Sequence, residues 1–177
     1  GDTLSAVAIH NGDFLENTQY NDVLYYMGQS SLGFPCGAIN RVRDQMSGEM
    51  YSSRGTWATN IASRLHQNHN TGIAMKTFIK GDSAYIEVHL RFTQPVTADM
   101  RLNVFLTENA IPAHSQSGVG SGYLHEHVLR YIVSASQGDV IDMSTVKEIV
   151  KTYSASIYGY NQNNLNIVTS VSNWGNT

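Results

Sequence analysis

The stretch that decides the fold is Tyr123-Leu124-His125-Glu126-His127-Val128-Leu129-Arg130-Tyr131. Side chains two residues apart share one face of a β-strand. A strand here predicts that His125 and His127 lie on one face, where they could bind a metal ion together. Zinc needs three or four ligands, and the stretch offers no nearby third. The ligand count therefore favours the alternative, two strand histidines that hydrogen-bond to neighbouring groups. Glu126 and Arg130 fall on the opposite face, where cross-strand ion pairs are expected.

The segments that flank this stretch also alternate between apolar and polar residues. The alternation is clearest in residues 85–92, after a hairpin turn at residues 81–83. Residues 100–108 repeat it, with Phe105 as the one apolar residue on the polar side. Further strands are expected at residues 73–80 and 165–171, and at 145–154, where a short helix stays an alternative. Several short strands separated by turns indicate an antiparallel sandwich or barrel.

The first part of the chain follows a different pattern. Residues 18–29 and 56–66 carry apolar side chains at helical spacing, and residues 4–10 and 37–42 predict strands. The period changes from 3.6 to 2 after Gly72. The sequence therefore predicts an α+β chain, with a helix-bearing segment at 1–71 and an antiparallel all-β sandwich domain at 72–177.

The composition limits the classes of function. Of the 177 residues, 41% are apolar, which is enough for a core, but only 14% are charged. A polar, uncharged surface of this kind is typical of secreted β-rich proteins. The net charge of −3 and the scattered basic residues exclude binding to nucleic acid through phosphate contacts. No apolar run is long enough to span a membrane as a helix.

The one cysteine, Cys36, follows Pro35. A single thiol makes no internal disulfide, and a buried thiol without an electropositive neighbour is unreactive. Most X–Pro bonds are trans, so the sequence alone favours a trans bond between Phe34 and Pro35.

Three segments of the chain resemble the outer-membrane-protein-28-related family of secreted bacterial proteins. They lie in the family's order: Val7-Ala8-Ile9-His10, Phe34-Pro35-Cys36-Gly37-Ala38-Ile39-Asn40-Arg41, and Val104–Glu108 with Tyr123–Arg130 after a loop. The resemblance implies a thioredoxin-like part followed by an all-β domain. It also implies that Pro35 and Cys36 form the cis-proline element of that part.

The chain departs from the family pattern at its start. The family's Cys-x-x-Cys-Pro element would precede Leu4, and this sequence does not contain it. Thiol–disulfide exchange needs two thiols, so this chain cannot perform it alone. The strand that carries the missing element would also lie between residues 7–10 and 37–41. We therefore expect a partial thioredoxin-like segment, in which another element has to satisfy the backbone groups of these two strands.

The long loop at residues 109–122 is rich in serine and glycine and is the expected contact surface, with His114 and Gln116 as contact residues. Glu108 and Glu126 lie on different strands, and their approach would be the only route to a paired-carboxylate site. No catalytic constellation is visible, and no cofactor is expected.

The sequence therefore favours a non-catalytic protein exported to the periplasm, outer membrane or cell surface of a bacterium. Its sandwich would bind a protein or glycan partner. The alternatives are a fragment of a thiol-disulfide oxidoreductase, and a metal-binding module that uses His125 and His127.

Overall fold

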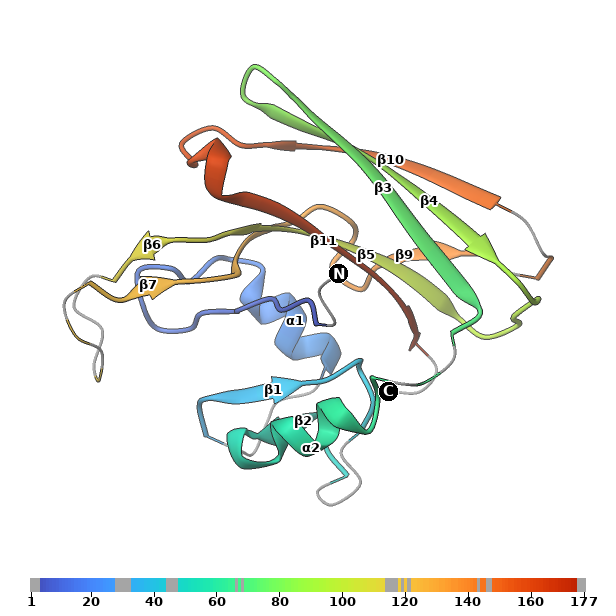
Figure 1. The fold of residues 1–177 in the computed structure, drawn as a ribbon, viewed down its shortest axis with the longest axis horizontal. Helices are drawn as coiled ribbons and strands as arrows, with labels where there is room; N and C mark the ends of the chain where they lie inside the picture. Colours follow the sequence, from blue (N-terminus) through green and yellow to red (C-terminus); the bar gives the residue numbers. More distant parts are fainter. Residues whose placement is uncertain are drawn as a thin grey trace.

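The computed structural model describes residues 4–27, 33–43, 48–65, 67, 69–113, 118, 120, 122–142, 144–145 and 148–174. Two antiparallel sheets dominate it (Figure 1). The three-stranded sheet has the order β10 (Glu148–Ser156), β4 (Ser83–Phe92), β3 (Thr71–Lys80). The four-stranded sheet has the order β11 (Leu165–Asn173), β5 (Met100–Glu108), β8 (Val128–Ile132), and β9 (Asp139–Ile141) also pairs with β5. The predicted antiparallel sandwich is confirmed.

The core of the sandwich lies between these two sheets. Every second residue of β4 is buried, and these side chains pack against the buried side of β5. The main cluster consists of Ile86, Val88, Leu90, Phe92, Leu102, Val104 and Ile141, all at most 3% exposed. Burial of this apolar area is the main stabilising contribution to the sandwich.

The hairpin that joins β3 to β4 has the turn expected from the sequence. Lys80 pairs with Ser83, so only Gly81 and Asp82 form the turn. Gly81 has a φ of +58°, a conformation that glycine adopts without steric cost.

Two residues on the polar side of β5 are buried and the other two are partly buried, which its sequence did not predict. Asn103 is 3% exposed and Thr107 is fully buried. The first part of the chain covers this face of the four-stranded sheet, opposite the three-stranded sheet (Figure 1). Its elements are α1 (Tyr20–Met27), β1 (Cys36–Ala38), β2 (Tyr51–Ser53), the 3-10 turn η1 (Arg54–Thr56) and α2 (Trp57–Ala62).

The first part of the chain also covers the free edge of β8. Ala8 forms a parallel bridge with Val128: its N–H donates to the His127 carbonyl at 2.8 Å, and its carbonyl accepts from the Leu129 N–H at 2.9 Å. The Gln19 side chain donates to the Ile132 carbonyl at 3.2 Å and accepts from its N–H at 2.7 Å. This edge is therefore satisfied by the chain itself.

A thioredoxin-like sheet is not confirmed for residues 1–71. β1 pairs with β2 rather than with a central strand, and the segment around Ala8 bridges to β8. The backbone groups that lacked a predicted partner therefore bond to other elements. α1 begins two residues later than predicted and α2 is shorter than predicted, and the short strand β9 was not expected from the sequence.

Candidate functional site

The histidine stretch is not one continuous strand, so the prediction that His125 and His127 share a face is wrong. β7 (Leu124–His125) ends before β8 begins. His127 lies in the break with a φ of 58°, where its N–H donates to Asn109 Oδ1 at 2.7 Å. A left-handed residue interrupts the alternation of faces. His125 is consequently buried, whereas His127 is exposed.

His125 lies against His10 instead. The centroids of the two rings are 4.9 Å apart in an edge-to-face arrangement, and Asp13 Oδ2 lies 2.7 Å from His10 Nδ1. Phe14 and Tyr123 pack edge-on against the His125 ring. His125 Nε2 is buried and has no hydrogen-bond partner among the described residues. Within the described residues, no three or more His, Cys, Asp or Glu side chains are grouped so that they could hold a metal ion.

The sequence missed the contribution of His10 and Asp13. The turn signal at residues 11–13 does indicate that these two side chains approach each other, because a tight turn brings its ends together. Their position beside His125 depends on the bridge between Ala8 and Val128, which joins segments more than one hundred residues apart and leaves no local pattern.

This cluster makes stability depend on pH. Burial, with a smaller contribution from His10, lowers the pKa of His125. Below about pH 6.5, the usual pKa of histidine, the unfolded chain protonates at His125 while the folded chain resists protonation. The free energy of unfolding therefore decreases as the pH falls through this value, until it reaches the lowered pKa. We expect His125→Gln to lose less stability than the wild type between about pH 7.5 and about pH 5.5 in urea unfolding.

Asp13 also titrates beside the ring, so the informative quantity is the difference between the variant and the wild type. Although burial acts in the opposite direction, hydrogen bonds from His10 and the Leu15 N–H hold the pKa of Asp13 below its usual value. His127→Gln is the matched control and should lose as much stability as the wild type. An equal loss in His125→Gln and the wild type would contradict the assignment.

The Phe34–Pro35 peptide bond is cis, contrary to the trans bond that the sequence alone favoured. Cys36 follows as the first residue of β1 and is a partly buried free thiol. The indole of Trp57 lies over the next residue: a Cβ added at Gly37 would come within 3.1 Å of the ring. Trp57 Nε1 donates to the Ser52 carbonyl at 2.9 Å. Trp57 therefore packs and hydrogen-bonds β1, β2 and α2 together.

The contact residues expected in the long loop, His114 and Gln116, lie outside the described residues. The base of this loop is a two-stranded ribbon, in which β6 (Ile111–Pro112) pairs with β7.

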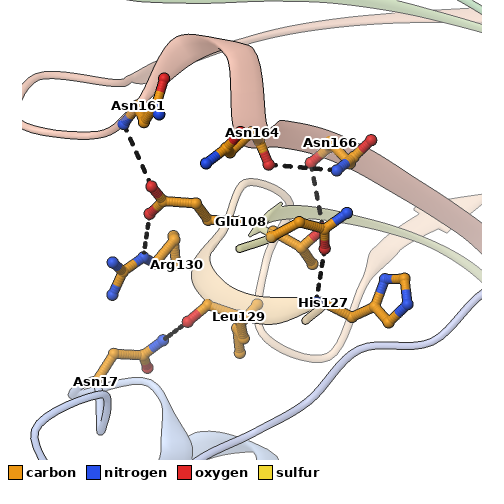
Figure 2. Close-up of polar contacts among 10 residues, drawn as sticks. Asn17, Glu108, His127, Leu129, Arg130, Asn161, Asn164 and Asn166 are labelled. Atoms are coloured by element: carbon orange, nitrogen blue, oxygen red, sulfur yellow. Dashed lines mark hydrogen bonds and ion pairs between the residues drawn. The ribbon is translucent and has the colours of Figure 1, made fainter. Parts of the chain in front are cut away.

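Glu108 and Glu126 each bind a different group. Glu108 is 6% exposed, and its Oε2 accepts from Arg130 Nε at 2.7 Å (Figure 2). Its Oε1 accepts from the Asn161 N–H at 3.2 Å. Glu126 accepts from the Ala110 N–H at 3.3 Å. The expected cross-strand ion pair is therefore present for Arg130, and Glu108 acts as a structural partner of β8 and of the segment before β11.

The apolar surface that stands out is β3. All of its residues except Thr71 are exposed, although half of them are apolar. Ile73 is 41%, Met75 38%, Phe78 62% and Ile79 47% exposed. The sequence predicted a strand here but not its exposure. The available signal was that apolar residues fall on both faces of the strand without a clean alternation, a pattern that does not define a buried side.

The face of the β3–β4 hairpin that carries Phe78, opposite the face of Ile73, Met75 and Ile79, holds aromatic and charged residues. Phe78 and Tyr85 stack with centroids 4.9 Å apart and planes 9° apart. His89 lies between two carboxylates, 2.7 Å from Glu87 and 2.9 Å from Glu148. These contacts raise the pKa of His89, mainly through Glu87. The face is therefore apolar toward the turn and charged toward the other end.

Comparison with known proteins identifies the family. The model of the family described as "Outer membrane protein Omp28" matches residues 23–177. A similar solved structure is HBP35 of Porphyromonas gingivalis, at a TM-score of 0.71 and 17% identity, over 86% of this chain. The chain spans 50% of the length of that protein. No curated protein sequence matches. Neither described α-helix is long and apolar enough to cross a lipid bilayer. The chain belongs to the Omp28 family of outer membrane proteins and is a protein of the bacterial outer membrane or cell surface.

Proposed function

We propose that this protein is a non-catalytic binding protein of the cell surface, and that its sandwich presents the three-stranded sheet to a partner. The observation that carries the proposal is the exposure of Ile73, Met75, Phe78 and Ile79 on one strand. Exposed apolar patches on soluble domains mark interaction sites more often than scattered single residues do.

The edge strands β8 and β3 differ in whether another part of the chain covers them. Residues of the first part cover the edge of β8 with backbone and side-chain hydrogen bonds. Among the described residues, β3 pairs with β4 alone. An uncovered apolar edge is a risk for aggregation unless it has a use. A binding role gives β3 such a use.

A protein partner fits this surface better than a glycan. The stacked pair of Phe78 and Tyr85 would suit either class of ligand. Ile73, Met75 and Ile79, however, offer only aliphatic surface and no side-chain hydrogen bonds for sugar hydroxyls. Val150 of β10, 49% exposed, adds apolar area on the face that carries the aromatic pair.

The proposal can be tested with a photo-crosslinking residue placed at Phe78 in the bacterium. Val140 on β9 is the matched control, because both side chains are 62% exposed. We expect a discrete protein adduct at position 78 and none at position 140. Phe78→Asp should also abolish an adduct formed from a crosslinker at Lys76, on the same face of β3, without changing the melting temperature. No adduct at position 78, or the same adducts at both positions, would refute the proposal.

A further inference from the structure

The free edge of β3 is long and regular. The strand pairs with β4 over all ten residues, from Thr71 opposite Phe92 to Lys80 opposite Ser83. The register has no bulge along this length. Edge strands are commonly protected by bulges, by short length or by a covering segment. Within the described part of the chain, β3 has none of these three protections, so it offers a complete template for one more strand.

The turn determines which backbone groups point outward. In a two-residue hairpin, the residues that close the turn exchange both hydrogen bonds, and such pairs alternate along the strands. Lys80 and Ser83 close this turn. The even-numbered residues of β3 therefore bond to β4. The N–H and C=O groups of Ile73, Met75, Thr77 and Ile79 point to the free edge.

The two faces of β3 differ in the side chains that they carry. Ile73, Met75 and Ile79 pair with buried residues of β4, so they extend the apolar inner face beyond β4. Lys76 and Lys80 lie on the other face with Phe78. The Lys76 side chain is 80% exposed, and its Nζ is 3.8 Å from Glu87. β3 contains two lysines and no acidic residue.

Building on the proposed function, we propose that the partner binds as an extended strand that pairs with the free edge of β3. Backbone hydrogen bonds to the odd-numbered residues hold it, as in other cases of β-strand addition. Its apolar side chains continue the inner face beside Met75, and its acidic side chains lie opposite Lys76 and Lys80. Such a segment alternates apolar residues with aspartate or glutamate.

The charges argue for this partner over a second copy of the chain. A second β3 would bring two more lysines and no carboxylate, in any register. Lysines on an edge disfavour self-pairing, whereas an acidic strand turns the same charges into cross-strand attractions.

The backbone part of the proposal is tested by Thr77→Pro. Thr77 is exposed and its N–H points outward, so proline removes that donor and keeps the bonds to β4. Thr77→Ala is the matched control, since it keeps the N–H. The probe is a fluorescent ten-residue peptide that alternates valine and glutamate, followed by fluorescence anisotropy. We expect the Kd to rise at least about tenfold in Thr77→Pro and to stay within about threefold in Thr77→Ala.

The charge part is tested with a second peptide that has lysine in place of glutamate. The wild type should bind the glutamate peptide at least about tenfold more tightly, and Lys76→Glu with Lys80→Glu should reverse this preference. This second comparison also decides the matter if the proline variant fails to fold. Equal binding of both peptides, no binding of either, or a proline variant that binds like Thr77→Ala would overturn strand addition.

Failure of this inference is distinguishable from failure of the proposed function. If position 78 crosslinks a partner while Thr77→Pro has no effect, the surface binds a partner in another mode. A concentration-dependent dimer of the wild type that Thr77→Pro abolishes would overturn the acidic partner in favour of a second copy.

Discussion

Phe92→Ala is expected to lower the free energy of unfolding by about 3–5 kcal/mol. Phe92 is 1% exposed and is the largest of the fully buried side chains. It ends β4 and belongs to the cluster that joins the two sheets, with Leu102 of β5 among its members. Alanine loses the transfer free energy of the ring and leaves a cavity that the surrounding strands fill only partly. Urea unfolding followed by tryptophan fluorescence measures the loss.

Phe78→Ala is the matched control for this prediction. The same side chain is removed from the neighbouring strand, at a position that is 62% exposed. Only its stacking on Tyr85 is lost, so a cost below about 1 kcal/mol is expected. Comparable losses for the two variants would contradict the distinction between a buried core on β4 and an open surface on β3.

The sandwich could be predicted from sequence because its strands carry their burial pattern locally. Residues 85–92 alternate strictly, and the structure buries one side of β4 and leaves the other side exposed or partly exposed. The alternation in the next segment also predicted the bounds of β5 correctly, as Met100–Glu108. A period of two needs no knowledge of distant residues, because it reports which face meets a core.

The covering of the four-stranded sheet could not be predicted in this way. Asn103 and Thr107 look like solvent-facing residues, yet they are buried. The first part of the chain, far away in sequence, lies over this face of the four-stranded sheet (Figure 1). The bridge between Ala8 and Val128 is a contact of the same kind. Long-range contacts leave no periodic signal in either segment, and so the arrangement of the elements in residues 1–71 could be inferred only from the resemblance, not from the pattern.

The prediction that His125 and His127 share one face was wrong for a local reason. One left-handed residue, His127, is enough to reverse the faces that follow. Its N–H is held by the side chain of Asn109, which lies 18 positions earlier in the chain. The candidate binding surface on β3 was missed for a reason that is not local. β3 was expected as a strand, but its place at the edge follows from the order of the sheet, which the sequence does not state.

Glu108→Gln is expected to lower the free energy of unfolding by about 2–3 kcal/mol. The glutamine keeps the shape and can still accept from the Asn161 N–H, so the lost charge is isolated. Removing one partner of a buried ion pair leaves the other charge without compensation, at a usual cost of about 3–5 kcal/mol. Arg130 keeps a 21% exposed side chain and lies 5.1 Å from the centroid of the Tyr160 ring, which reduces this cost.

The double variant Glu108→Gln with Arg130→Gln separates the pair from its surroundings. Because both charges are then absent, we expect it to be less destabilised than the sum of the two single variants, with a coupling of at least about 1 kcal/mol. Glu87→Gln is the surface control: its side chain is 40% exposed, its ion pair with Lys76 is long, and its other partner, His89, is partly exposed. A smaller loss than in Glu108→Gln is therefore expected. Additive losses at Glu108 and Arg130 would mean that the hydrogen bond to Asn161, and not the ion pair, anchors β5 at this end of the sandwich.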